Sequence, residues 1–205
     1  MRSAIVLAGG SSTRAGTDKG LRLLGGKPLV NHVIDAVDRH VDEVIVVVAS
    51  EAQRSKYVPV VKKNIKLVTD MYPDGSPLVG LLSGLSRCGG SYALAVACDM
   101  PFISEDAVET LFREAKNHDG AVFEKPNSWI EPLVAVYRVD SALKEARRLY
   151  GEGDLRVRMI LMNLGDVMRI PLERLRKMDP ELLTLFDADT EDRFIEAERL
   201  LKRTS

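Results

Sequence analysis

The sequence of 205 residues has few cysteines, few aromatic residues and almost no excess charge. Its two cysteines, Cys88 and Cys98, lack zinc-site spacing, and such sparse cysteine usage is typical of a reducing compartment. The formal net charge of −1 argues against a basic surface for nucleic acid. No apolar run approaches the roughly 18 residues of a membrane-spanning helix, and the N-terminus does not resemble a signal peptide. We therefore expect a cytoplasmic protein that binds neither nucleic acid nor membrane.

What the sequence does contain is a glycine-rich loop directly after an apolar run. Residues 7–19 read LAGGSSTRAGTDK. The glycines have no Cβ and let backbone N–H groups approach an anion, while Arg14 and Lys19 offer a guanidinium fork and a mobile point charge to phosphate oxygens. The spacing matches neither a Walker A loop nor a dinucleotide fingerprint. We predict a site for a nucleoside triphosphate; the alternative is a flexible surface loop with two solvated cations.

Apolar runs that predict strands alternate with helical patterns along the sequence. Through residue 118, the expected strands are 3–8, 44–48, 65–68 and 92–97, and helices are expected at 28–40, 51–57, 78–85 and 105–118. This alternation predicts a parallel, doubly wound sheet, because parallel strands need crossover connections. Further strands at 121–123, 133–137 and 167–170, with helices at 142–150, 155–164 and 190–202, predict an antiparallel strand and an extra lobe.

Two aspartates follow predicted strands at the sheet edge that carries the loop. Asp70 follows the third strand and Asp99 the fourth. Ligands of open α/β sheets bind outside the carboxyl ends of the strands, so both carboxylates should face the phosphates. A cation must then separate the negative charges, and Mg²⁺ is the natural one. The alternatives are a turn residue or helix cap at Asp99 and a turn residue at Asp70.

A second acidic cluster, residues 186–192, precedes the last predicted helix. Asp187 and Asp189 point the same way if the segment is extended, and either could join Asp99 at one metal. The alternative is a capping arrangement in which Asp189 or Thr190 begins the helix.

The chain resembles the molybdenum cofactor guanylyltransferases, and the resemblance runs from residue 4 to about residue 200. The first loop is shared by many nucleotidyltransferases, and the other segments narrow the family: GGKPLVNHV, DGSPLVGLLSGL, ACDMPF and FDADTEDRF. The resemblance implies one Rossmann-like three-layer α/β domain, residues 1–205, with a mostly parallel mixed sheet, one antiparallel strand and a small C-terminal lobe. Residues 1–118 would form its nucleotide-binding half and residues 119–205 its acceptor-binding half.

The resemblance also implies the reaction: Mg²⁺-dependent transfer of GMP from GTP to molybdopterin, empty or molybdenum-loaded, with release of pyrophosphate. The acceptor phosphate is already anionic and would attack the α-phosphorus in line with pyrophosphate, without a general base. Other molybdenum-cofactor enzymes are candidate partners. The implied nucleotide-binding residues are Leu7, Ala8, Gly9, Gly10, Lys19, Asp70 and Asp99. The implied catalytic residues are Arg14, Lys19 and Asp99, with Asp99 as the magnesium ligand.

Two departures from the family pattern affect these expectations. Ala15 stands where the family usually has methionine after the loop arginine. Asp187 and Asp189 stand where the family often has asparagines, which puts an amide contact to the pterin in doubt. Gly9 favours guanine, since the related cytidylyltransferases resemble LAAG at this point. The alternatives are a molybdopterin cytidylyltransferase, a guanylyltransferase for another phosphorylated acceptor, and a GTP-binding regulatory module.

Overall fold

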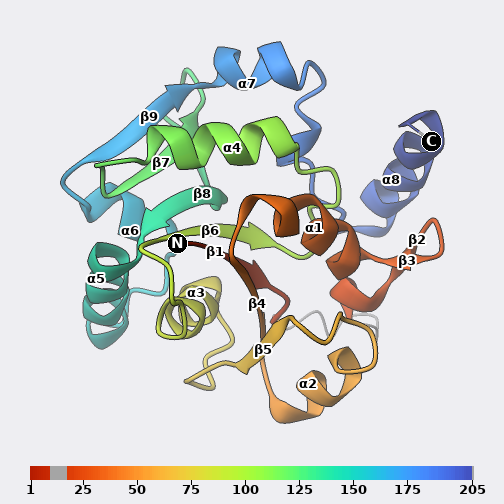
Figure 1. Ribbon diagram of the computed structural model, residues 1–205, viewed down its shortest axis with the longest axis horizontal. Helices are drawn as coiled ribbons and strands as arrows, with labels where there is room; N and C mark the ends of the chain where they lie inside the picture. The colour runs from red at the N-terminus through yellow and green to blue at the C-terminus, as the bar shows by residue number, and fades with distance from the viewer. Residues whose placement is uncertain (10–17, 205) are drawn as a thin grey trace.

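A seven-stranded mixed sheet forms the centre of the protein (Figure 1). The computed structural model describes residues 1–9 and 18–204. The strand order is β5-β4-β1-β6-β8-β7-β9. The strand bounds are β1 Arg2–Leu7, β4 Glu43–Val48, β5 Lys66–Thr69, β6 Tyr92–Ala97, β7 Gly120–Glu124, β8 Ile130–Arg138 and β9 Val167–Pro171. Only β8 runs antiparallel to its neighbours, which confirms the predicted mixed sheet with one antiparallel strand.

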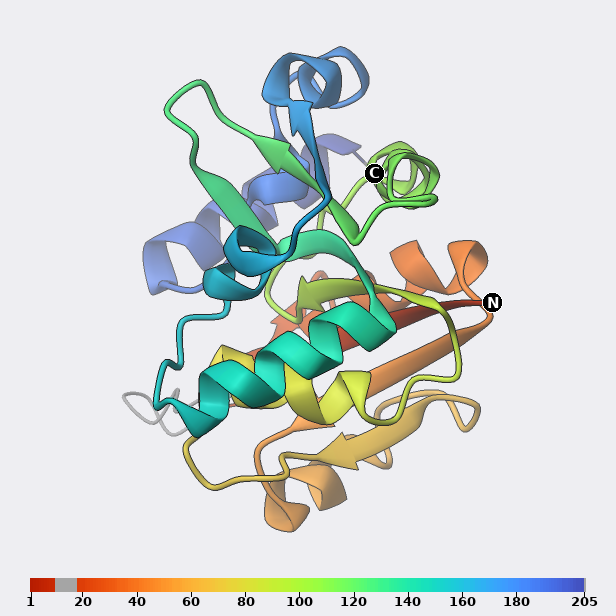
Figure 2. The same ribbon diagram turned by 90° about the vertical axis from the view of Figure 1, so that its left-hand side faces the viewer.

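Helices cover both faces of this sheet, and therefore strands β1, β4 and β6 consist of nearly continuous buried apolar residues. One face packs against α1 Leu29–Val37, α2 Glu51–Tyr57, α4 Glu105–Glu114 and α7 Leu172–Met178. The other face packs against α3 Pro77–Leu85, α5 Val139–Gly151 and α6 Arg158–Asn163. Figure 2 shows α3 and α5 side by side on this second face. The arrangement is the predicted three-layer α/β sandwich.

Serine caps define where three of these helices begin. Ser50, Ser76 and Ser104 each accept a hydrogen bond from the backbone N–H three residues later. Such a cap satisfies one of the free N–H groups at a helix start. Consequently α2, α3 and α4 leave the carboxyl ends of β4, β5 and β6 at defined residues, and this fixes the loops that border the site.

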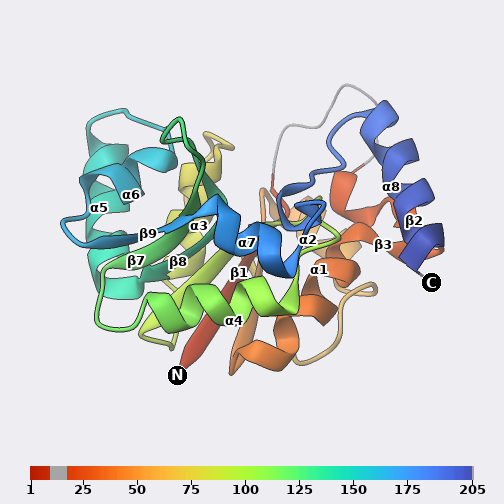
Figure 3. The same ribbon diagram turned by 90° about the horizontal axis from the view of Figure 1, so that it is seen from above.

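A small lobe sits beside the main sandwich. The two-stranded sheet β2 Leu23–Leu24 and β3 Lys27–Pro28 packs against helix α8, Glu191–Thr204 (Figure 3). Gly25 and Gly26 form its hairpin turn with φ values of 57° and 82°, which glycine adopts without strain. A third apolar cluster, which includes Leu24, Phe186 and Phe194, lies between these elements. The last helix thus covers the segment that follows the glycine-rich loop.

The structure differs from the predicted elements at several boundaries. The helix predicted to end at residue 118 stops at Glu114, because Asn117 is left-handed with φ 68° and breaks the helical path. The helix predicted from residue 155 begins at Arg158, because Asp154 accepts the Arg156 N–H in an Asx turn. Short 3₁₀ turns at Lys19–Leu21, Asp38–His40 and Leu183–Leu185 complete the fold.

No helix in the described ranges is long and apolar enough to cross a membrane. The division of the domain at residue 118 stays a prediction.

Candidate functional site

Four strand ends meet at one edge of the sheet. Strand β1 pairs in parallel with β4 and β6, and β4 pairs in parallel with β5. Backbone hydrogen bonds continue these ladders past the strands: the Gly9 N–H donates to Val47 O at 3.0 Å, the Asp70 N–H to Val48 O at 2.9 Å and the Cys98 N–H to Leu7 O at 3.0 Å. The predicted nucleotide residues Leu7, Ala8, Gly9, Asp70 and Asp99 therefore lie at a common edge. Gly10 and Arg14 fall outside the described residues.

Asp70 brings an unpaired carboxylate oxygen to this edge. Its Oδ1 is buried and has no hydrogen-bond partner in the described structure. Burial raises the pKa of Asp70 from its usual 3.8 to about 6, since water no longer stabilises the charge. An unpaired buried acceptor is rare in folded proteins and requires an explanation. A ligand with N–H or O–H donors, such as a nucleoside, would supply the missing partner.

Gly9 allows the ends of β1, β4 and β5 to approach one another closely. A Cβ built on Gly9 would lie 3.1 Å from the Ala49 nitrogen and 3.4 Å from Asp70 Oδ2. The first distance is tighter than ordinary van der Waals contact, so a side chain there would push against the β4 backbone. The glycine therefore keeps the start of the loop close to the carboxylate of Asp70.

Lys19 and Asp99 form an ion pair across the site. The Lys19 Nζ lies 3.7 Å from Asp99 Oδ2, and only 16% of the Asp99 side chain is exposed. Burial raises the pKa of Asp99, while the Lys19 charge opposes that rise. The carboxylates of Asp187 and Asp189 are near enough to raise it further. A cation bound here would relieve that repulsion.

The C-terminal acidic segment runs directly beside Asp99. The Ala188 N–H donates to the Asp99 carbonyl at 2.8 Å, which brings both flanking aspartates to the site. Asp187 Oδ1 lies 3.0 Å from Arg193 Nε, and Asp189 Oδ1 lies 3.9 Å from the same nitrogen. The pKa of Asp187 is raised, chiefly by burial and then by its hydrogen bond with Asp189.

The predicted capping arrangement exists in the same segment. Thr190 Oγ1 accepts the Arg193 N–H at 3.3 Å and so caps α8. Capping therefore uses the threonine, and the carboxylates of Asp187 and Asp189 lie beside Asp99 with Arg193 as their partner. Whether either aspartate contacts a metal stays a prediction.

The donor set at Asp99 suits a magnesium ion with few protein ligands. In residues 1–9 and 18–204, no three His, Cys, Asp or Glu side chains are grouped to hold one metal. Mg²⁺ does not require such a group, because it commonly takes one or two carboxylates and fills its octahedron with phosphate oxygens and water. Asp99, at the end of β6 with the carboxylates of Asp187 and Asp189 nearby, fits this mode of binding.

Glu131 is a site residue that the sequence did not reveal. It stands at the beginning of β8, and its Oε1 accepts the Leu133 N–H at 3.1 Å. Burial raises the pKa of Glu131, and the charges of Asp187 and Asp99 raise it further. Glu131 therefore belongs to the same acidic surroundings, on the strand that pairs with β6. The sequence gives no clear signal for this role, because Glu131 precedes the strand expected at 133–137 and only the structure extends β8 back to Ile130.

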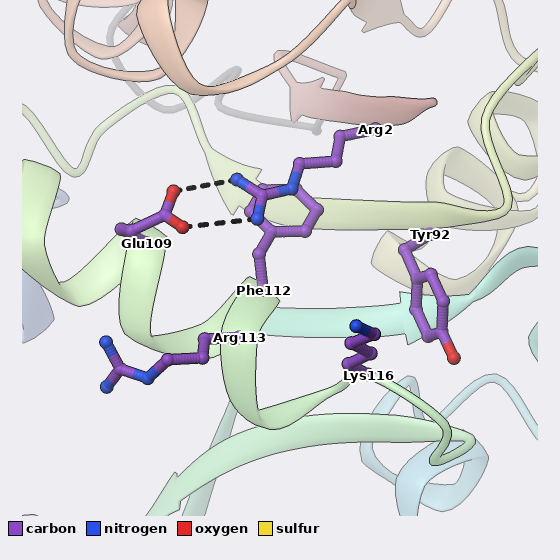
Figure 4. A pocket seen from close by; sticks show the side chains of 6 residues that line it. All are labelled: Arg2, Tyr92, Glu109, Phe112, Arg113 and Lys116. Atoms are coloured by element: carbon purple, nitrogen blue, oxygen red, sulfur yellow. Dashed lines mark hydrogen bonds and ion pairs between the residues drawn. The ribbon is translucent and has the colours of Figure 1, made fainter.

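A separate pocket lies at the opposite end of the parallel strands, where β1 and β6 begin. Its volume is about 250 Å³, and Figure 4 shows its lining residues Arg2, Tyr92, Glu109, Phe112, Arg113 and Lys116. Arg2 donates to both Glu109 carboxylate oxygens at 2.7 and 3.2 Å and lies over the Phe112 ring. Because the glycine-rich loop follows the other end of β1, this pocket is not part of the candidate site.

Comparisons with known proteins show what this chain is similar to in sequence and fold. The sequence model of the MobA-like NTP transferase domain matches residues 4–167. A probable molybdenum cofactor guanylyltransferase of Methanosarcina acetivorans is 35% identical, over 92% of this chain and 86% of that protein. The molybdenum cofactor guanylyltransferase of Desulfosudis oleivorans is 29% identical, over 98% of this chain and 96% of that one. The solved structure of molybdopterin-guanine dinucleotide biosynthesis protein A from Archaeoglobus fulgidus superposes with TM-score 0.84 and 27% identity, over 99% of this chain and all of that one.

Proposed function

This chain belongs to the MobA-like NTP transferase family, and we propose that it transfers GMP from GTP to molybdopterin and releases pyrophosphate. The observation that carries the proposal is the Lys19–Asp99 pair at the carboxyl edge of the parallel strands, 3.7 Å apart. A lysine for phosphates and a carboxylate for a divalent cation are the two charged groups that nucleotidyl transfer needs most. Relatives named for this reaction align with nearly the whole sequence.

The nucleoside is proposed to lie against the end of β1. Leu7, Ala8 and Gly9 would present backbone groups to it, and the unpaired Oδ1 of Asp70 would accept one of its N–H or O–H donors. Guanine offers O6 as an acceptor and N1–H and N2–H₂ as donors, a pattern that cytosine cannot match. A wrong base would leave buried polar groups unpaired, at about 1–3 kcal/mol each.

Lys19 and Arg14 are proposed to hold the phosphates. Lys19 projects from the first turn after the loop toward Asp99, so its ammonium would lie between that carboxylate and the triphosphate. In-line attack by the acceptor phosphate builds charge on the transferring and leaving oxygens, and a preorganised cation stabilises it. Arg14 would share this role from the loop. The attacking phosphate is already anionic, so no side chain has to remove a proton from it.

Asp99 is the proposed magnesium ligand, with Asp187 and Asp189 as further candidates. A bound Mg²⁺ would supply charge neutralisation for the phosphates. Ionised Asp99 would hold it, and Lys19 keeps that carboxylate oriented. As part of this proposal the protein works in the cytoplasm, where GTP is available, and takes molybdopterin at the half of the domain that contains Glu131.

The direct test is to incubate the protein with GTP, MgCl₂ and molybdopterin and to identify the product by mass spectrometry. The proposal predicts a guanine dinucleotide of molybdopterin, with one pyrophosphate released for each product formed. A sugar phosphate replaces molybdopterin in a parallel reaction. The proposal is wrong if pyrophosphate appears only with that acceptor, or if no GMP is transferred under conditions in which the protein binds GTP.

A further inference from the structure

The side chain of Gln53, on helix α2, connects the two ends of the glycine-rich loop. Its Nε2 donates to the Ala8 carbonyl at 2.9 Å and to Asp18 Oδ2 at 2.5 Å. Its Oε1 accepts the Ala49 N–H at 2.6 Å. Ala8 precedes the loop and Asp18 follows it, so one amide group sets the separation of the loop ends. No other amide in the described residues makes a comparable bridge at this edge of the sheet.

The carboxylate of Asp18 accepts three hydrogen bonds, although its role as a helix cap requires only one. As the N-cap of the turn Lys19–Leu21, its Oδ1 accepts the Gly20 N–H at 3.2 Å. The Tyr57 hydroxyl donates to the same oxygen at 2.6 Å. With Gln53 on Oδ2, two of the three donors come from α2. A capping carboxylate needs only the bond from the Gly20 N–H. The bonds from Tyr57 and Gln53 therefore serve a different purpose.

The packing around Tyr57 makes this connection rigid. The Tyr57 side chain is fully buried, and burial raises its pKa far above the usual value, so the hydroxyl stays a donor. A Cβ on Gly20 would clash with the Tyr57 hydroxyl and would lie 3.2 Å from Cys98 Sγ. The turn that carries Lys19 therefore rests directly on Tyr57 and on the residue before Asp99.

We propose that Gln53 and Tyr57 are positioning residues that hold Asp18 and, through it, place the ammonium of Lys19 for phosphate transfer. Neither side chain touches the substrate in this proposal. The inference rests on the proposed function, in which Lys19 stabilises the transferring phosphate. Its physical basis is that a displacement of about 1 Å at a charged catalytic group can lower the rate by about 10²-fold.

The test uses Gln53→Glu and Tyr57→Phe, with Tyr137→Phe as the matched control. Gln53→Glu keeps the shape but replaces the bond to Asp18 with repulsion between two carboxylates, and the bond to the Ala8 carbonyl with repulsion between two acceptor oxygens. Therefore kcat should fall about 10- to 100-fold with a smaller change in KM for GTP. Tyr57→Phe removes one bond to Asp18 and should lower kcat about 3- to 10-fold. Tyr137 is equally buried and donates one bond, to the Pro132 carbonyl at 2.7 Å. Its variant should lose stability without a matching loss of kcat.

A double-mutant cycle with Lys19→Ala separates positioning from a general structural effect. If Gln53 acts through Lys19, then Gln53→Glu lowers kcat by less than about twofold in the Lys19→Ala background. An equal loss in both backgrounds overturns the inference, and so does a folded Gln53→Glu or Tyr57→Phe variant with wild-type kcat. Tyr57→Phe is the milder change and serves if Gln53→Glu fails to fold.

A readout without catalysis keeps this inference distinct from the proposed function. Acetic anhydride labels lysine amines, and mass spectrometry compares Lys19 with the exposed Lys63. Loss of the bridge should raise Lys19 labelling relative to Lys63 in Gln53→Glu but not in Tyr137→Phe. If the wild type transfers no GMP yet Lys19 labelling rises, the proposed function fails and the bridge stands. If GMP is transferred and Lys19 labelling does not change in Gln53→Glu, the bridge does not position Lys19.

Discussion

Replacing Asp70 with asparagine should stabilise the protein while it weakens nucleotide binding. The Asp70 carboxylate carries a buried oxygen that has no partner among residues 1–9 and 18–204, and its pKa is raised from 3.8 to about 6 by burial. The folded protein therefore binds an extra proton between these two pH values. Stability falls as the pH rises through that window and stays lower above it.

The size of the effect follows from the shift. Two pKa units correspond to about 3 kcal/mol at most. Because the Asp70 side chain is only partly buried, solvent screening reduces this to roughly 1–2 kcal/mol. For a protein of this length the gain in Tm at neutral pH is about 3–6 °C. The asparagine removes the charge and leaves a smaller cost for an unpaired neutral group.

The assay is thermal unfolding without nucleotide at neutral pH and again near pH 3.8, the usual carboxyl pKa. Asp70→Asn should gain stability only at neutral pH, whereas the exposed Asp106→Asn control should gain little at either pH. In the same samples, calorimetry should show weaker GTP binding for Asp70→Asn. A loss of stability at neutral pH, or a gain of equal size at both pH values, would refute the reasoning about Asp70.

Three further substitutions test the site. Asp99→Asn should remove most turnover while it retains part of the GTP affinity, and a magnesium titration that gives near-wild-type kcat at low magnesium would contradict a ligand role. Lys19→Ala should lower kcat by about 10²–10³, as measured by steady-state kinetics, and a change confined to KM would show that Lys19 acts only in ground-state binding. Gly9→Ala should raise KM for GTP by about tenfold or more, because its Cβ would press on the Ala49 backbone. Gly151→Ala is the control, because a Cβ there meets no atom of the described residues within 4 Å, and equal KM values for the two variants would contradict the Gly9 argument.

Much of the fold was predictable because local and tertiary preferences agree. The apolar runs of β1, β4 and β6 are buried on both faces, and the serine caps mark the helices that follow the strands. Strands β2 and β3 were not predicted, since two-residue strands have no periodicity and depend on packing against α8. Helix α7 was also missed, because Leu172–Met178 is short and largely charged.

A residue of the candidate site was predictable only where its position directly after a predicted strand places it at the site. Asp70 and Asp99 could be placed because the carboxyl ends of parallel strands meet at one edge. The contact between Asp99 and Ala188 was not predictable in detail, since it joins distant segments by a single backbone hydrogen bond. Gln53 gave no signal either. Its role depends on side-chain geometry between α2 and the loop ends, and a lone glutamine on a helix is ordinary in any sequence.

The choice of base tests the central claim most directly. The measurement is kcat/KM for pyrophosphate release from GTP, CTP, ATP and UTP, each with magnesium and molybdopterin present. GTP should exceed each of the others by at least about 10- to 100-fold, and release should depend on the acceptor. A kcat/KM for CTP equal to or above that for GTP would contradict the guanylyl assignment, and would identify the protein as a cytidylyl rather than a guanylyl transferase.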